Sequence, residues 1–107
     1  MEDPKKVENR NHLSIELPAE VARGAYSNLA VISHSDAEFV LDFIQVIPGT
    51  QKAEVRSRVI MTPQHAKRLL MAMEENVEKY ERAHGPINVP QREVNLPPNF
   101  GGPTGFA

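Results

Sequence analysis

Apolar and polar residues alternate with a period of two through much of the first 61 residues, a pattern typical of half-buried β-strands. The alternation over 13–17 predicts a short strand that Pro18 ends. Segments rich in β-branched and other apolar residues predict three further strands, over 25–33, 38–47 and 53–61. Because short connections join consecutive strands, we expect an antiparallel meander of these four strands.

The connections carry turn residues. Pro48-Gly49 suits the centre of a type II turn, in which Pro sets φ and Gly takes the positive φ. A single helical turn is expected over 18–23, closed by Gly24. His34-Ser35-Asp36 has the residue types of a hydrolytic triad, but three consecutive residues cannot face one another as nucleophile, base and orienting group. We therefore interpret this segment as a polar turn.

After residue 61 the period changes to that of an amphipathic helix. Thr62 is a suitable N-cap, Pro63 suits the first helical position, and Gly85-Pro86 ends the helix, which predicts a helix over 63–84. Its apolar stripe consists of Ala66, Leu69, Leu70, Met73, Val77 and Tyr80. The predicted fold is α+β: a four-stranded antiparallel meander followed by one long C-terminal helix packed on one face of the sheet.

Composition divides the chain into three parts. Apart from Met1, residues 1–11 hold one large apolar residue, Val7, and predict a disordered arm. Residues 85–107 contain five of the nine Pro and four of the six Gly, and predict a tail without regular structure. Residues 12–84 are then a single domain. Within the tail, apolar residues at loose alternation can dock as an extended segment: Ile87, Val89, Val94 and Leu96.

The remaining composition excludes several classes of function. The 12 Lys+Arg and 14 Asp+Glu give a net charge of -2, too balanced for a general polyanion binder. The absence of Cys excludes thiolate metal sites and Cys nucleophiles, and the four His show no metal-ligand spacing. Gly24 and Gly49 are isolated, so no phosphate-binding loop is present. We expect no cofactor, no metal and no enzymatic activity.

No apolar run is long enough to span a membrane, and the N-terminus does not resemble a signal peptide, so we expect a cytoplasmic protein.

The predicted sheet has more apolar surface than one helix can cover. The strand over 38–47 is apolar on both faces, which is unusual for an antiparallel strand with one side in water. The second face, with Val40, Ile44, Val46 and Ile60, is therefore a candidate interface for a dimer or tetramer, or for another protein. The alternative is that the tail folds back over this face.

Charged residues add two expectations. Asp42 lies among apolar residues and needs a partner, for which Arg56 and Arg58 on the next strand are available. The expected helix has Lys67 and Arg68 near its start and Glu residues near its end, the reverse of what the helix dipole favours. A candidate basic rim follows: Lys52, Arg56, Arg58, Lys67 and Arg68. It is either a site for an acidic protein surface or nucleic acid, or a solvated face paired with Glu38 and Glu54.

Several segments resemble a family of short bacterial proteins that is described as a domain of unknown function. They are YSNLAVISHS from Tyr26, EFVLDF from Glu38, Pro48-Gly49, and VRSRVIMTPQHAKRLL from Val55. The resemblance covers residues 13–87 and leaves the arm and the tail outside. The family implies no activity and no catalytic residues. The order of elements is also similar to that of SecB-type export chaperones, oligomers that hold unfolded chains in apolar grooves. Some members of this family are encoded beside the genes for the large RNA polymerase subunits, which implies a transcription accessory role.

Three functional hypotheses follow. The first is a non-enzymatic interaction module that docks on a large assembly such as RNA polymerase, with the basic rim against an acidic surface. The second is a SecB-like holdase that binds unfolded clients on the apolar sheet face. The third is nucleic-acid binding through the rim alone, which predicts an affinity that falls steeply with salt.

Overall fold

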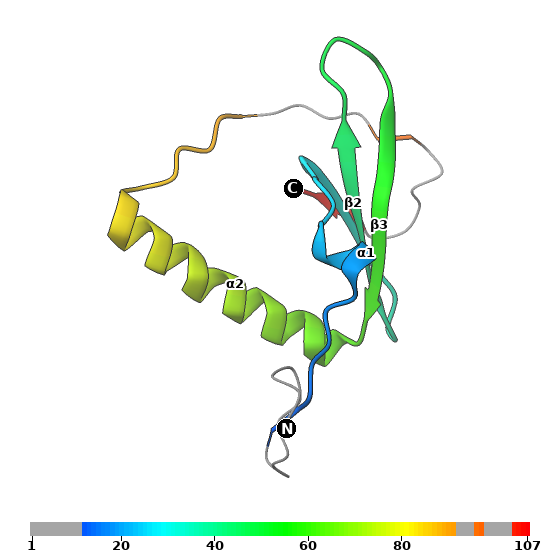
Figure 1. Ribbon diagram of the computed structural model, residues 1–107. Coiled ribbons are helices and arrows are strands. Elements are labelled where there is room, and N and C mark those ends of the chain that lie inside the picture. Colours follow the sequence, from blue (N-terminus) through cyan, green and yellow to red (C-terminus); the bar gives the residue numbers. More distant parts are fainter. Residues whose placement is uncertain (1–11, 92–95, 98–103) are drawn as a thin grey trace.

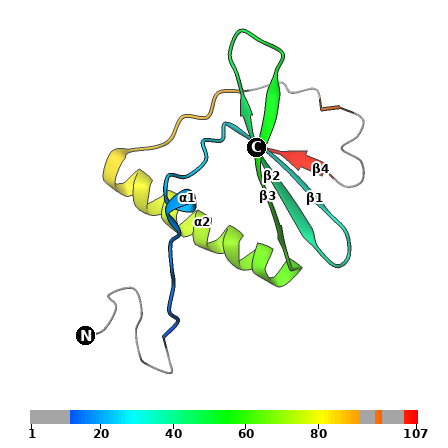
Figure 2. The same cartoon turned by 45° about the vertical axis from the view of Figure 1, so that its right-hand side comes forward.

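Three strands form the predicted meander: β1 (Leu29–His34), β2 (Phe39–Val46) and β3 (Ala53–Met61). A fourth strand, β4 (Thr104–Phe106), pairs antiparallel with β1, so the order in the sheet is β3-β2-β1-β4 (Figure 2). The computed structural model describes residues 12–91, 96–97 and 104–107; the predicted arm and Val94 lie outside these residues. The α+β class is confirmed, but one strand of the sheet comes from the end of the chain.

The N-terminal strand prediction is wrong. Residues 13–17 are extended but belong to no strand, and the side chains of Leu13, Ile15 and Leu17 are exposed. Alternation shows that a segment has an apolar face, but it does not provide a sheet edge for that face to join. The edge of β1 is instead occupied by the last residues of the chain, where Ala30 and Ala107 exchange two backbone hydrogen bonds of 2.6 and 2.7 Å.

The predicted turns are confirmed. Helix α1 (Ala19–Ala22) is the short turn expected after Pro18, and Gly24 follows it at φ 73°. Gly49 has φ 80°, and the Thr50 N–H donates to the Ile47 carbonyl at 3.3 Å, which is the pattern of a type II turn.

Two side chains prolong the β1–β2 pairing before β1 begins. The prediction started this strand at residue 25, whereas the strand starts at Leu29. The Asn28 side-chain amide donates to the Val46 carbonyl at 3.0 Å, and its oxygen accepts from the Val46 N–H at 2.7 Å. The Ser27 hydroxyl contacts the carbonyls of Leu29 and Ile44 at 3.0 and 3.1 Å. Side chains thus make the hydrogen bonds that a longer strand would make through its backbone.

The helix has the predicted bounds, but its packing differs from the prediction. Helix α2 (Pro63–His84) is capped by the Thr62 hydroxyl, which accepts from the His65 N–H at 3.2 Å, and Gly85 ends it at φ 89°. It leaves the end of β3 and runs away from the sheet (Figure 1). No residue of α2 is buried. The expectation that the helix packs on one sheet face is therefore wrong.

The core lies within β1 and β2. Leu29 and Val31 pair with Ile44 and Asp42 across these strands and share one face of the sheet. Val46 and, from the tail, Leu96 pack against the cluster of Leu29, Val31 and Ile44. The prediction that the tail has no regular structure is wrong for Thr104–Phe106, and Leu96 helps to close the core.

Candidate interaction surface

The four predicted interface residues on the sheet do not form one open surface. Ile44 is buried in the core and Val46 packs against it, while Val40 is half-buried. Only Ile60, on the edge strand β3, is more than half exposed, at 55%. Leu96, from the tail, packs on this face. This contact agrees with the alternative expectation that the tail folds back over the sheet. This face is mostly the core of the chain itself.

Asp42 and Arg58 face each other on β2 and β3. The Arg58 Nε and Nη2 atoms donate to the two carboxylate oxygens at 2.6 and 2.8 Å, a bidentate pair. Asp42 is buried, whereas the Arg58 side chain remains 59% exposed. The hydrogen bonds to Asp42, and secondarily its negative charge, raise the pKa of Arg58. This pair makes a buried carboxylate compatible with the core, so we assign Arg58 a structural role.

A bulge separates Arg56 from this arrangement. Phe43 faces Ser57 and Ile44 faces Val55, so Arg56 is the additional residue on β3. The bulge moves Val55 to the face that carries Arg58 and Ile60, which the strict alternation of the sequence did not predict. The Arg56 guanidinium lies 3.7 Å from the Glu54 carboxylate. This ion pair is one that we expected if the basic residues pair within the chain.

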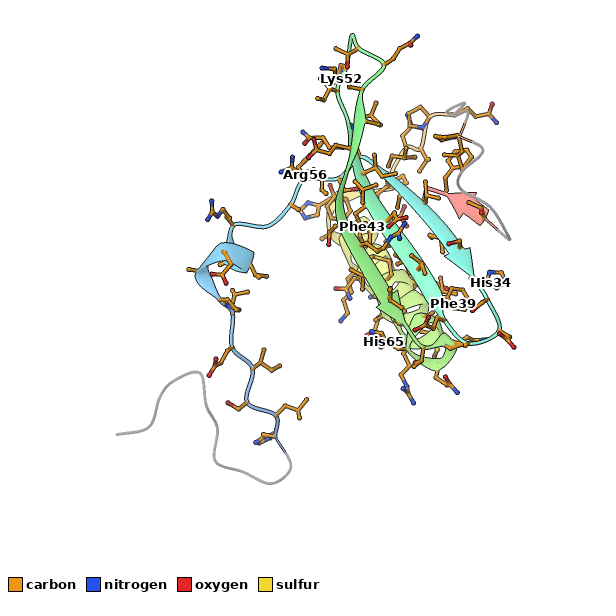
Figure 3. The ribbon with its side chains drawn as sticks, turned by 90° about the vertical axis from the view of Figure 1, so that its right-hand side faces the viewer. His34, Phe39, Phe43, Lys52, Arg56 and His65 are labelled. Atoms are coloured by element: carbon orange, nitrogen blue, oxygen red, sulfur yellow. The ribbon has the colours of Figure 1, made fainter. Side chains whose placement is uncertain are left out.

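The five residues of the predicted basic rim do not gather in one patch. Lys52 lies at the tip of the β2–β3 hairpin and His65, in the first turn of α2, lies at the opposite end, with Arg56 between them (Figure 3). Lys67 and Arg68 follow His65 on the helix. Since Arg56 and Arg58 already have acidic partners, the cations left for a partner form separate sites at the two ends of β3.

Among the described residues, the stripe on α2 is a long apolar surface without a partner, although the sequence predicted that it packs on the sheet. Four of its six members are strongly exposed: Leu70 at 55%, Met73 at 57%, Val77 at 38% and Tyr80 at 53%. Near its C-terminal end the helix borders a shallow hollow, which is lined by Asn76, Val77, Tyr80 and Ile87. The sequence contains the unusual charges of this helix, at Lys67 and Arg68, but no signal that its apolar stripe stays exposed.

Other exposed features accompany the stripe. Strand β3 is an edge strand, exposed along its length except at Met61, and its outer backbone groups face away from β2. Long exposed edges readily accept a further strand. The extended N-terminal segment adds Leu13, Ile15 and Leu17 to the exposed apolar residues.

The chemistry-bearing residues have structural contacts. The Ser35 hydroxyl accepts from the backbone N–H groups of Ala37 and Glu38 at 3.2 and 3.3 Å, as expected for a turn. His34 stacks on Phe39 with 5.1 Å between ring centroids, and His84 lies 4.7 Å from the Tyr80 ring. Across the residues that the structure describes, no group of three His, Cys, Asp or Glu side chains is placed to hold a metal ion.

No helix within the described residues has the length and apolar character needed to cross a membrane.

Comparisons with known proteins place the chain in one family. Neither the curated proteins nor the solved structures gave a match. A family model described as "Protein of unknown function (DUF3467)" matches residues 1–89. The match includes the arm, which the sequence analysis had left outside the resemblance, and ends before Leu96 and β4, the tail elements that complete the sheet and its core. Because the model covers most of the chain, this protein belongs to the DUF3467 family.

Proposed function

We propose that this is a cytoplasmic, non-enzymatic module that binds other proteins, and that the α2 stripe is its principal binding surface. The observation that carries the proposal is a 22-residue amphipathic helix without a buried residue. Amphipathic helices in water owe most of their stability to the packing of the apolar face. A contiguous exposed apolar stripe bordered by charged residues is the usual form of a protein-binding surface.

A large assembly with an acidic surface is the partner that the proposal favours, and RNA polymerase is the first to test. Lys67 and Arg68 lie at the start of α2, beside the stripe, and neither forms an ion pair within the described residues. An acidic surface that meets the stripe would also meet these cations. Arg58 takes no part, because its guanidinium is paired with Asp42.

Affinity capture from cells at native expression level, with quantitative mass spectrometry, tests the proposal. We expect the wild type to capture a short, stoichiometric set of proteins. The Met73→Glu variant should lose this set, and the Met71→Glu variant should still capture it. Both methionines are exposed, but only Met73 belongs to the stripe. Binding of purified RNA polymerase, with Lys67→Glu and Arg68→Glu as charge-reversal variants, then tests the partner. Equal capture by the wild type and both methionine variants would argue against the stripe as the binding surface.

A holdase function is the second candidate, because the exposed residues of α2 include two methionines. Met71 and Met73 are 60% and 57% exposed, and flexible Met side chains adapt to varied apolar ligands. We expect suppression of the aggregation of an unrelated unfolded protein, weakened by Met73→Glu. Val40→Glu and Ile44→Glu are poor tests, because these residues lie in or beside the core. A long, substoichiometric set of captured, aggregation-prone proteins would favour this function over the accessory role.

A further inference from the structure

We propose that α2 pairs antiparallel with α2 of a second copy of this chain, about a two-fold axis at Met73. The inference rests on the proposed role of the stripe as a protein-binding surface: a second copy occupies the stripe in the dimer, and an external partner competes with that copy for it. Pairing with a second copy buries in each subunit the side chains that are exposed in the single chain.

The apolar stripe is arranged almost symmetrically about Met73. Seven residues before and after it stand Ala66 and Tyr80, and four residues before and after it stand Leu69 and Val77. An antiparallel two-fold contact brings each residue opposite its counterpart and Met73 opposite itself. The smallest side chain of the stripe then faces the largest, which allows the two helices to approach without a clash. A pattern that is its own complement is what an isologous interface requires.

Charge supports the antiparallel direction. Lys67, Glu74 and Glu81 recur at a seven-residue spacing along one flank of the stripe. Antiparallel pairing brings Lys67 beside Glu81 of the partner subunit at both ends of the interface, two opposite-charge pairs against one like-charge approach of Glu74 to its own copy at the axis. In parallel pairing this flank would instead face the flank of Leu69, Asn76 and Ala83, which carries no charge, so this ion pair would not form. Antiparallel helices also bring opposite ends of their dipoles together, which offsets the unfavourable position of Lys67 and the glutamates within a single helix.

The hollow beside α2 lies where the partner's side chains arrive. It is lined by Val77 and Tyr80 of the stripe together with Asn76 and Ile87. Val77 lies four residues after the proposed axis, so Leu69 of the partner subunit lies opposite it. Leu70 of the partner subunit lies opposite Asn76, at the rim of the same hollow.

Sedimentation equilibrium of the purified full chain, over a range of concentrations, tests whether the interface exists. We expect a concentration-dependent dimer. Met73→Glu places two carboxylates at the axis and reduces the dimer to monomer, whereas Met71→Glu on the opposite side of the helix leaves it intact. A wild type that remains monomeric, or a dimer that Met73→Glu does not affect, would overturn the proposal. Far-UV circular dichroism checks that both variants keep α2.

Cysteine crosslinking tests the direction, since the chain contains no Cys. We expect Met73→Cys to form a disulfide-linked dimer. Ala66→Cys and Tyr80→Cys should not crosslink separately, and should crosslink when the two variants are mixed. Disulfides within each single variant, and no disulfide between the two variants in the mixture, would show parallel helices and overturn the proposal.

The two proposals fail in different ways. A chain that is monomeric by itself but still captures a stoichiometric partner through the stripe contradicts the dimer and retains the proposed function. A dimer with the expected crosslinks that captures no other protein contradicts the proposed function and retains the dimer.

Discussion

The sheet and helix α2 are built from apolar patterns of similar regularity, but they differ in what covers them. Each described residue that is buried lies in β1 or β2: Leu29, Val31, Leu41, Asp42 and Ile44. Helix α2, with 22 residues, is nearly as long as the 6, 8 and 9 residues of β1, β2 and β3 together and contributes none. In the sheet, β4 pairs with the edge of β1 and Leu96 packs against the core, whereas the stripe of α2 has no cover within the described residues.

This difference shows that a regular apolar face does not specify which surface will bury it. In the sheet, hydrogen bonding to adjacent strands brings side chains together at a set register. A helix satisfies its backbone internally and therefore has no comparable constraint on its neighbour. Its apolar side remains available for a partner outside the chain. The comparison predicts that substitutions in the sheet change stability and that substitutions on the stripe change association.

The largest expected effect comes from Arg58→Glu. The substitution removes a bidentate partner from the buried Asp42 and places a second carboxylate opposite it, so we expect loss of cooperative folding. Urea denaturation followed by circular dichroism measures this. Arg56→Glu is the matched control: it lies at the bulge with a 3.7 Å ion pair, and its unfolding midpoint should stay close to that of the wild type. Similar midpoints for the two variants would refute the structural role of Arg58.

The next effect compares one apolar residue from each region. Ile44→Ala opens a cavity in the core and should lower the free energy of unfolding by about 2–5 kcal/mol. Leu70→Ala removes a side chain that is 55% exposed. In dilute protein, where the chain is monomeric, its cost should stay within about 0.5 kcal/mol. Chemical denaturation at low concentration measures both, and equal losses would mean that α2 packs on its own sheet.

A smaller effect is expected at Asn28, whose side chain pairs with the backbone of Val46. Asn28→Ala leaves the Val46 N–H without its acceptor and should cost about 1–3 kcal/mol. Asn76→Ala is the counterpart on α2, where the amide donates to the Ala72 carbonyl at 2.9 Å on the exposed helix. Because Ala is a better helix former than Asn, this variant should be neutral or slightly more stable. A loss at Asn76 as large as that at Asn28 would contradict the contrast between the two regions.

The smallest effect is expected at the start of the helix. Thr62→Ala removes the acceptor for the His65 N–H and should destabilise α2 by about 1 kcal/mol, while Thr62→Ser retains the cap. No residue of α2 is buried against the sheet, so the two parts should open independently. In Thr62→Ala, amide hydrogen exchange should therefore accelerate in α2 and stay unchanged in β1 and β2. Equal acceleration in the strands would show that helix and sheet unfold as one unit.

Much of the local structure could be predicted from the sequence, because the determining contacts lie a few residues apart. The Thr62 cap, the end of α2 at Gly85 and the type II turn at Pro48-Gly49 are cases of this kind. The Asp42–Arg58 pair was also within reach, since antiparallel neighbours bring β2 and β3 side by side. Register alone did not distinguish Arg58 from Arg56, because the bulge at Arg56 depends on how β3 fits its neighbour.

The candidate surface was harder to predict. Sequence reasoning identified the apolar excess but placed the open surface on the sheet, at Val40, Ile44, Val46 and Ile60. The structure buries Ile44, packs Val46 against the core and exposes the stripe of α2. Each apolar pattern is visible in the sequence. The sequence does not show which of these apolar faces the rest of the chain will bury.

The sequence by itself determined the elements whose hydrogen bonds are local: three strands of the meander, both helices and the turns between them. Only the tertiary structure decided that Thr104–Phe106 joins the sheet, that 13–17 does not, and that α2 keeps its apolar side open. The physical reason is that local hydrogen bonds depend on neighbouring residues, whereas burial depends on which distant segments reach the same surface first and fit it best.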